Sequence, residues 1–151
     1  RVMEVDVEKL KRDWTGFTFD TAEFEVNASD LVSFASACGE TGKRYTDPAD
    51  PDFQAVPNYT SRYVGRRILP DSFPRLGSGY GFDAGKCVTP IAPIRPGDKV
   101  VAKSQIHDIY TKTGRSGTML FIVHRMEFSN QRGEPVSVVA WRMVQQERGA
   151  R

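Results

Sequence analysis

The sequence has few of the residues that form disulfides or bind metals in small domains. It contains two cysteines, Cys38 and Cys87, and two histidines among 151 residues. Cys38 follows apolar residues of a predicted helix, where an unpaired cysteine is usually a small buried side chain. Since the sequence has neither a Cys-x-x-Cys pair nor a His-Glu-x-x-His motif, we expect no metal site. These absences favour a reducing, cytoplasmic location.

Charge of one sign and long apolar runs are also missing. The 21 basic and 19 acidic residues give a net charge of +2, which is too little for a surface that binds nucleic acid. No stretch approaches the roughly 20 apolar residues of a membrane-spanning helix, and the start of the chain does not resemble a signal peptide. With 39% hydrophobic residues, residues 1–151 are expected to form one domain around one core.

The first half of the chain carries helical patterns. Residues 1–16 predict a short helical extension, with apolar residues recurring among charges. The clearest helix follows Asn27 or Ser29, either of which can cap its first turn, and Gly39 can end it. A second predicted helix runs from Asn58 to Leu69 and stops before Pro70.

Two segments have no regular period. Residues 40–57 are rich in proline and aspartate, which favour turns. Long connections inside compact domains tend to be functional, so this is the first place to search for a site. Residues 71–85, rich in glycine and aromatic side chains, also predict a loop.

The remaining segments alternate as strands do. Residues 17–26 and 86–92 predict short strands, and 99–110, 118–128 and 135–146 predict three long ones joined by glycine-bearing loops. Such neighbours form an antiparallel meander. Helices followed by strands indicate the α+β class.

The strand 118–128 is apolar on both faces. One face holds Leu120, Ile122, Met126 and Phe128, and the other holds Met119, Phe121 and Val123. A helix is expected to cover one face. A second copy or a partner subunit would cover the other, unless that face is buried inside the same domain.

Three phrases of the sequence resemble one family. They are Phe-Ala-x-Ala-x-Gly-Glu at 34–40, Arg-Pro-Gly-Asp-x-Val at 95–100 and Asn-x-x-Gly-Glu-x-Val at 130–136. Over residues 17–146 the chain resembles the MaoC-like hydratases, and more narrowly the fatty-acid-synthase-type dehydratase domain that forms the front half of double-hotdog enzymes. The resemblance implies a hotdog fold, in which an antiparallel sheet wraps around a central helix and two units pair. It also implies reversible hydration of a 2-enoyl thioester to the (R)-3-hydroxyacyl thioester.

The catalytic motif of that family is altered here. It resembles Gly-Asp-x-Asn-Pro-x-His, and the matching stretch has Glu40 in place of aspartate, Gly42 in place of asparagine and Tyr45 in place of histidine. Tyrosine titrates near 10, whereas imidazole titrates near neutral pH and suits proton transfer there. We therefore favour a non-catalytic copy that works with a catalytic hotdog partner, over a variant site built from Glu40 and Tyr45.

The two histidines, His107 and His124, fall on predicted strands. A histidine on an alternating strand is more often solvated or hydrogen-bonded than catalytic. We expect neither to take part in the chemistry.

Binding residues are implied at the start of the second helix. In hotdog proteins the amides there receive the thioester oxygen, which by position matches Asn58 and Tyr59. Arg62 and Arg66 could contact CoA phosphates, or be ordinary solvated charges. No cofactor is expected beyond the acyl-CoA or acyl-carrier-protein thioester itself.

Three functions remain in order of preference. The first is a subunit or half of an (R)-specific enoyl-CoA hydratase or 3-hydroxyacyl dehydratase, in a homodimer or heterodimer of hotdog units. The alternative is a non-enzymatic module that binds acyl-CoA or lipid. A hotdog thioesterase is third, because such enzymes place a carboxylate near the central helix and residues 58–69 contain none.

Overall fold

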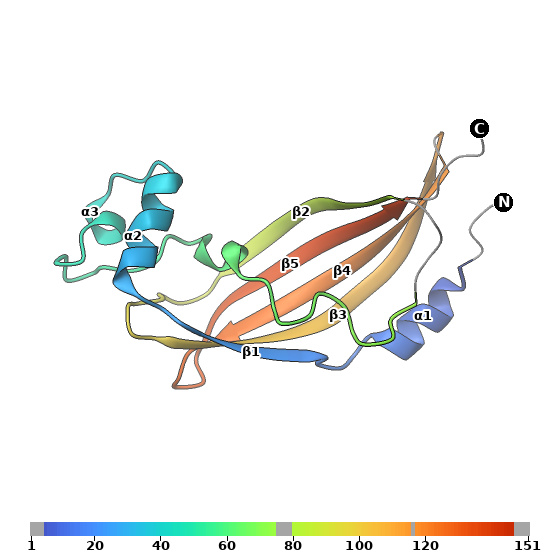
Figure 1. Cartoon of the computed structure of the whole chain (residues 1–151), viewed down its shortest axis with the longest axis horizontal. Coiled ribbons are helices and arrows are strands. Elements are labelled where there is room, and N and C mark those ends of the chain that lie inside the picture. Colours follow the sequence, from blue (N-terminus) through green and yellow to red (C-terminus); the bar gives the residue numbers. More distant parts are fainter. Residues whose placement is uncertain (1–4, 75–79, 116, 147–151) are drawn as a thin grey trace.

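The described part of the chain forms an antiparallel sheet with helices at its two ends (Figure 1). The computed structural model describes residues 5–74, 80–115 and 117–146. Within them the five strands have the order β1-β3-β4-β5-β2. The strands are β1 (Asp20–Glu25), β2 (Tyr80–Pro90), β3 (Lys99–Gly114), β4 (Gly117–Ser129) and β5 (Pro135–Gln146). The helices are α1 (Val7–Trp14), α2 (Ala28–Ala37), α3 (Lys43–Thr46) and the 3-10 turn η1 (Tyr59–Arg62).

The predicted meander is confirmed. Strands β3, β4 and β5 are antiparallel neighbours in which Ile106 lies opposite His124 and His124 lies opposite Trp141. The hairpin between β3 and β4 is longer than predicted, because residues 111–114 continue β3. Threonines favour extended backbone, and the hydroxyls of Thr113 and Thr118 are 3.2 Å apart across the two strands.

Helix α2 begins and ends as the sequence indicates. The Asn27 side chain accepts a hydrogen bond from the Asp30 amide at 2.9 Å, and Gly39 takes the positive φ of 76° that ends many helices. Cys38, predicted to be buried, is exposed. It is the residue at the C-cap of α2 and so lies beyond the buried face.

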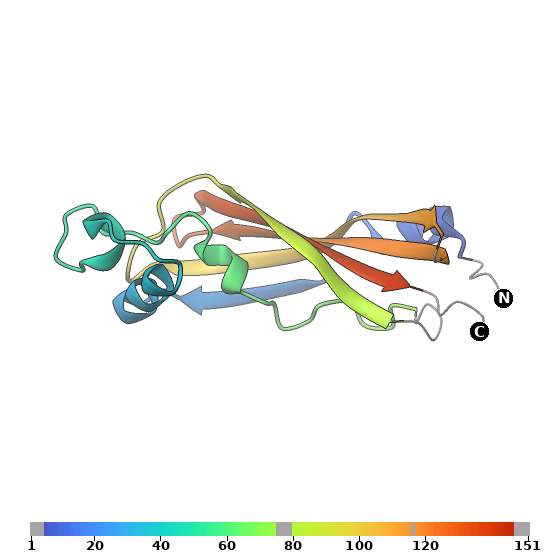
Figure 2. The same cartoon turned by 90° about the horizontal axis from the view of Figure 1, so that it is seen from above.

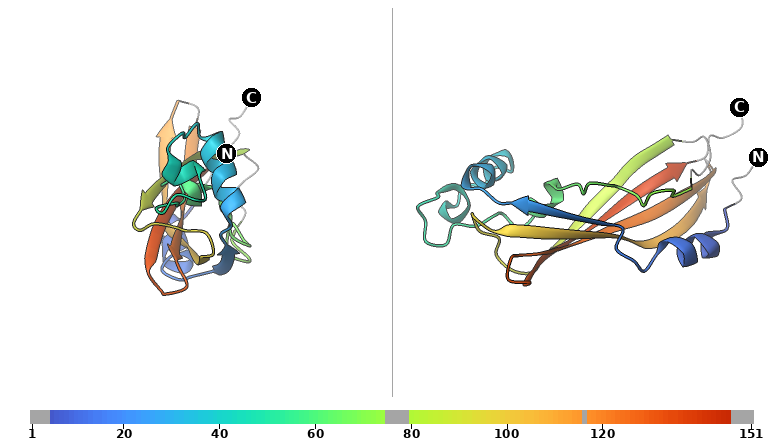
Figure 3. Two further views of the ribbon diagram at one scale, coloured as in Figure 1. Left: turned by 90° about the vertical axis from the view of Figure 1, so that its left-hand side faces the viewer. Right: turned by 60° about the horizontal axis from the view of Figure 1, so that its bottom comes forward.

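One face of the sheet carries the core, in two clusters. Helices α1 and α2 lie at opposite ends of the sheet (Figure 3). The larger cluster lies beneath α2 and η1, and it includes Leu31, Ala35, Tyr59, Val100, Ala102, Met126, Phe128 and Val139. The smaller cluster lies beside α1 and consists of Leu10, Ile106, Ile109, Leu120 and Ile122. Between the ends, the chain from η1 onward runs alongside the sheet as a coil (Figure 2).

The predicted helix from Asn58 to Leu69 is wrong. After η1 the chain turns extended at Tyr63, with φ −81° and ψ 133°. The amides of Arg66 and Arg67 donate to the Asp20 carboxylate at 2.8 and 3.4 Å, which takes them away from helical partners. Local spacing is a weak indicator of helix, and this tertiary contact overrides it. We call residues 63–69 the cover segment.

The loop predicted at 71–85 is also wrong in part, because β2 begins at Tyr80. Glycines and a register shift between Asp83 and Lys86 hide the strand period. Residues 75–79 lie outside the described part of the chain. No helix in the described ranges is both long and apolar enough to span a membrane.

Candidate functional site

The loop after α2 does not assemble an acid and a base. Glu40 is exposed, and its amide donates to the Ala35 carbonyl at 2.9 Å. Tyr45 is half-buried and packs against the larger cluster. A hydrogen bond with the Tyr45 side chain is the largest cause that raises the pKa of the Arg44 guanidinium, and the negative charge of Asp52 is the second. Across the described residues, no hydrogen bond joins the side chains of Glu40 and Tyr45, so this loop offers no dyad by itself.

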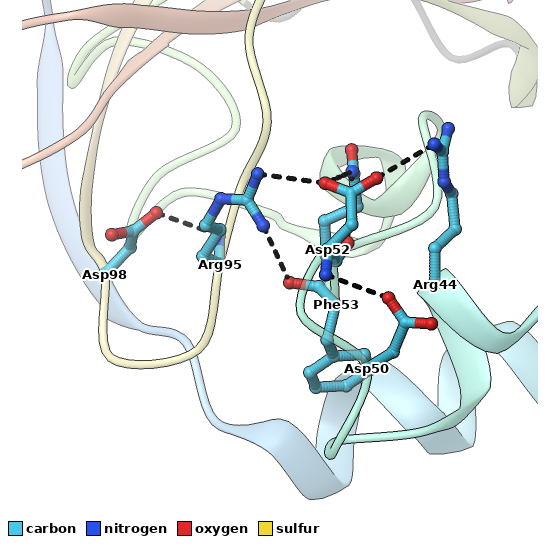
Figure 4. Close-up of polar contacts among 7 residues, drawn as sticks. Arg44, Asp50, Asp52, Phe53, Arg95 and Asp98 are labelled. Atoms are coloured by element: carbon cyan, nitrogen blue, oxygen red, sulfur yellow. Dashed lines mark hydrogen bonds and ion pairs between the residues drawn. The ribbon is translucent and has the colours of Figure 1, made fainter.

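Asp52 ties this loop to the turn that precedes β3 (Figure 4). Its carboxylate is 2.8 Å from the Arg44 guanidinium and 3.1 Å from that of Arg95. Arg95 also donates to the Phe53 carbonyl at 3.2 Å, and its amide donates to Asp98 at 2.9 Å. These ion pairs are exposed, so each stabilises little. Their role is to hold the loop in place over the sheet end.

Two of the predicted thioester-binding residues are engaged inside the protein. Tyr59 is 1% exposed, and its hydroxyl accepts hydrogen bonds from Arg62 at 2.9 Å and from Tyr63 at 3.1 Å. Burial first, and then the bond to Tyr59, raise the pKa of Tyr63. Arg62 also lies 3.8 Å from Asp30. Its guanidinium therefore links η1 to α2.

Asn58 and Arg66 have exposed side chains. The Asn58 amide group lies 3.9 Å from the Cys38 sulfur. The backbone of Arg66 is fixed by Asp20, which leaves the guanidinium on the outer side of the cover segment. Because the expected helix is absent, the four predicted residues do not share one helix face.

Among the hollows that the described residues form, two bear on the site. The first, of about 180 Å³, is lined by residues that include Val56, Pro57, Ile91, Pro93 and Ser137. Asn58 follows Pro57 in the chain. The second, of about 280 Å³, lies between the cover segment and the far ends of β5 and β2. We call it the groove. Its lining is mostly apolar: Ile68, Leu69, Gly81, Phe82, Ile122, Trp141, Met143, Val144 and Gln145.

A row of polar residues crosses the sheet between the two core clusters. Each strand contributes one of them, in the order Asp20, Ser104, His124, Trp141 and Lys86. Ser104 lies opposite Met126, so it is diagonal to His124, whereas the other neighbours in the row are directly opposite each other. We call these residues the polar row. Sequence reasoning missed it, although one signal was present. His124 stands at a core-facing position of β4, between Ile122 and Met126, where an apolar residue is expected.

His124 is not solvated, although a histidine on an alternating strand was expected to be solvated or hydrogen-bonded. It is 2% exposed, and its Nε2 atom has no hydrogen-bond partner in the described residues. Its ring lies against those of Phe19 and Trp141, with centroids 5.7 and 6.1 Å away. Burial, followed by the charge of Lys86, lowers the pKa of His124 to about 4. The imidazole is therefore neutral at physiological pH.

The strand order and the match to solved structures define a hotdog fold. Residues 13–139 match the family described as FAS1-like, dehydratase domain region. The chain belongs to this family. The comparison with curated proteins finds no significant match.

Solved structures of low sequence identity share the fold. The ChsH1–ChsH2 complex from Mycobacterium tuberculosis has a chain with a TM-score of 0.69 and 16% identity, covering 96% of this chain and 91% of its own. A MaoC-like dehydratase from Phytophthora capsici has a TM-score of 0.67 and 22% identity, covering 97% of this chain and 51% of its own. The HadBC (3R-hydroxyacyl-ACP dehydratase) complex from M. tuberculosis has a chain with a TM-score of 0.58 and 18% identity, covering 87% of this chain and 93% of its own.

Proposed function

We propose that this chain is one half of an (R)-specific enoyl-thioester hydratase, and that a second hotdog unit supplies the catalytic aspartate and histidine. The observation that carries the proposal is the state of the loop after α2. Glu40 is exposed, Tyr45 packs against the core, and the loop contains no imidazole. The chain has the fold of the family but lacks the dyad at the matching position.

Hydration of an enoyl thioester needs three groups. A base activates water, an acid protonates the α-carbon, and a donor stabilises the enolate oxygen. In the described structure Tyr45 is paired with Arg44, and no hydrogen bond joins its side chain to that of Glu40. A partner with an intact motif would fill the first two roles.

The edge of β2 is a suitable pairing surface. It is an end strand of the sheet, Tyr80–Pro90, and most of its described side chains are exposed. Phe82 is 47% exposed there. A long open edge presents unpaired amides and carbonyls that favour addition of another strand. Pairing at this edge would extend the sheet across two units.

Three neighbours agree with a two-unit assembly. ChsH1–ChsH2 and HadBC are complexes of two named components, and the P. capsici dehydratase is about twice as long as the region that this chain matches. HadBC is named a 3R-hydroxyacyl-ACP dehydratase. By analogy, the present chain would pair with an unlike hotdog unit.

The first hollow is where we place the thioester. Pro57 lines it, and the exposed Asn58 is the next residue in the chain. The guanidinium of Arg66 is exposed as well and would meet the phosphates of CoA or of a carrier-protein arm. Tyr59, in contrast, supports this position from inside, through its bonds to Arg62 and Tyr63.

The test is hydration of crotonyl-CoA, followed by loss of the enoyl absorbance. We expect no turnover by the chain alone, and turnover when a hotdog partner with an intact Asp/His motif is added. In the reconstituted pair, Glu40→Gln and Tyr45→Phe should each change the rate less than about twofold. Full activity of the chain alone, lost on Glu40→Gln, would establish the variant site instead.

A non-enzymatic acyl-binding module is the second candidate. The groove favours it, because an apolar hollow of about 280 Å³ has room for part of an acyl chain. Saturable binding of acyl-CoA, without turnover beside any hotdog partner, would decide for this function.

A further inference from the structure

The cover segment is tied to the sheet by one side chain. Within the described residues, the backbone of 64–69 makes no hydrogen bond to the backbone of any strand. The amides of Arg66 and Arg67 donate instead to one oxygen of the Asp20 carboxylate, at 2.8 and 3.4 Å. A charged carboxylate is a stronger acceptor than a neutral carbonyl. Asp20 is therefore the main polar connection between the segment and the sheet.

The surroundings of Asp20 are shaped for this contact. Asp20 is 7% exposed, and no ion pair joins it to a basic side chain within the described part of the chain. A buried carboxylate is unfavourable unless hydrogen bonds compensate it. Gly65 passes directly over it, since a Cβ there would lie 2.5 Å from Asp20 Oδ2 and 3.3 Å from Ser104 Oγ. The glycine lets the following amides reach the carboxylate.

Side-chain packing adds little in the middle of the segment. Val64, Arg66, Arg67 and Ile68 are exposed, and the apolar pair, Val64 and Ile68, are 47% and 42% exposed. The ion pair between Arg67 and Asp71 is exposed as well, so it stabilises little. A segment with few buried contacts opens at a lower free energy than the rest of a fold.

Both ends of the segment are anchored in the core. At the first end the Tyr63 ring stacks on that of Phe24, with centroids 4.1 Å apart. At the second, Leu69 and Phe73 pack against the smaller cluster, and the Phe73 ring meets that of Trp14 at 5.3 Å. The segment thus has two fixed ends and one attachment between them. Loss of the attachment would free the middle while the ends stay in place.

The attachment lies beside the groove. Ile68, which follows Arg67 directly, forms the outer wall of the groove together with Leu69. The opposite wall belongs to the sheet and includes Ile122 and Met143. Movement of the segment would therefore widen the groove without disturbing the strands (Figure 2). The width of the groove depends on Asp20.

We propose that Asp20 is a positioning residue that sets the outer wall of the groove, and that release of the cover segment from Asp20 admits an apolar ligand. The identification of this ligand as the tail of an acyl thioester rests on the proposed function above. The attachment of the segment does not, and it needs no second hotdog unit.

Limited proteolysis with trypsin tests the attachment, because trypsin cleaves after Arg66 and Arg67. Cleavage there follows the population in which the segment has left the sheet, whereas cleavage after Arg125, in the central strand β4, requires global unfolding. We expect Asp20→Ala to speed cleavage after Arg66 or Arg67 at least about tenfold, and Asp20→Asn, which keeps a neutral acceptor, only about threefold. If Asp20→Ala does not fold, the threefold effect of Asp20→Asn is decisive.

Asp98→Ala is the matched control. Asp98 is 6% exposed and accepts from the Arg95 amide at 2.9 Å and from Gln131 at 3.0 Å. These bonds persist when the cover segment opens, so Asp98→Ala should speed cleavage after Arg125 only. Equal acceleration of cleavage in the segment by Asp98→Ala would show that the segment opens only by global unfolding. That result, or no acceleration in the Asp20 variants, would overturn the proposal.

The opening of the groove is measured with 1-anilinonaphthalene-8-sulfonate (ANS), whose fluorescence reports apolar surface. In stopped-flow mixing, Asp20→Ala should raise the ANS association rate constant at least about fivefold, and Asp98→Ala should not, because release of the segment limits entry. Gly81→Leu locates the site. A Cβ at Gly81 meets nothing closer than 3.8 Å, so the larger side chain has room to fill the groove and should abolish this binding.

The outcomes separate the two proposals. An unchanged association rate in Asp20→Ala, ANS binding that survives in Gly81→Leu, or no ANS binding at all would refute release of the segment as the entry step. Neither assay uses a thioester or a partner. Failure of the reconstituted pair to hydrate crotonyl-CoA would therefore refute the proposed function and leave the role of Asp20 intact.

Discussion

The two core clusters differ in what covers them. The larger is closed by a capped helix, α2, and by aromatic side chains, since Phe24 and Tyr63 stack with centroids 4.1 Å apart and Tyr63 meets the Tyr59 ring edge-on at 5.5 Å. The smaller cluster is covered by the short helix α1 and by Leu69 and Phe73. The groove opens beside the second cluster, through Ile122 and Met143.

This difference follows from the missing helix. The resemblance implied a central helix along the sheet, and residues 58–69 were expected to form it. In its place η1 and aromatic rings fill the space at one end, and the extended cover segment spans the middle. An extended segment covers less of a sheet face than a helix of about 10 Å diameter. One end is therefore packed as a core, and the other is left hollow enough for a ligand.

The largest expected effect is the loss of packing at the closed end. Phe128 is 1% exposed in the larger cluster, and Phe128→Ala should lower the free energy of unfolding by about 3–5 kcal/mol. Met143→Ala, on the groove wall, should cost only about 1 kcal/mol, the usual loss for a substitution outside a packed core, because Met143 is half-buried and its neighbours already border a hollow. Urea unfolding of both variants measures the difference. Equal losses would contradict the contrast between the two ends.

The next effect is a pH dependence centred on His124. Its pKa is lowered from 6.5 to about 4 in the folded protein, so the unfolded chain binds its proton at higher pH. The contribution of neutral His124 to the free energy of unfolding is complete above about pH 6.5. It is lost as the pH falls toward 4, by up to about 3 kcal/mol. Lys86 adds to the lowering, while Asp20 opposes it.

Unfolding free energies between pH 4 and 7 would show this loss. In His124→Phe the slope across the window should decrease by the contribution of one proton. His107→Gln should keep the slope of the parent protein, because His107 is exposed. If the pH dependence persists in His124→Phe and disappears in His107→Gln, it arises from His107 and the prediction fails.

The sequence predicted the elements that local signals determine, and it failed for the cover segment, which a distant contact determines. Helix α2 and strands β3 to β5 were predicted because local signals sufficed: the Asn27 cap, the Gly39 stop and the alternation through β4. The cover segment was mistaken for a helix because Tyr59 and Tyr63 are spaced for one. What decides its path is Asp20, which lies 46 residues before Arg66. Such a contact has no trace in the local sequence.

The site divides in the same way. The motif position at Glu40 and Tyr45 could be located from the sequence, because it follows a recognisable helix end. The polar row could not, because its members come from five strands and become neighbours only through the register of the sheet. His124 alone gave a local hint, as a polar residue at a core-facing position of β4.

The smallest expected effect concerns how the cover segment sits on the row. A Cβ added at Gly65 would lie 2.5 Å from Asp20 Oδ2 and 3.3 Å from Ser104 Oγ. Since Asp20 is buried and holds two backbone amides, it cannot move aside freely, and Gly65→Ala should cost about 1–2 kcal/mol. Gly81→Ala, on the groove wall, meets its nearest atom at an ordinary 3.8 Å and should be neutral within about 0.5 kcal/mol.

Thermal unfolding compares the stability of the two variants, and hydrogen exchange at the Arg66 and Arg67 amides locates the effect. Faster exchange there in Gly65→Ala, with Gly81→Ala unchanged, would show that the cover segment has lost its hold on Asp20. Unchanged exchange would mean that Asp20 does not hold the segment down.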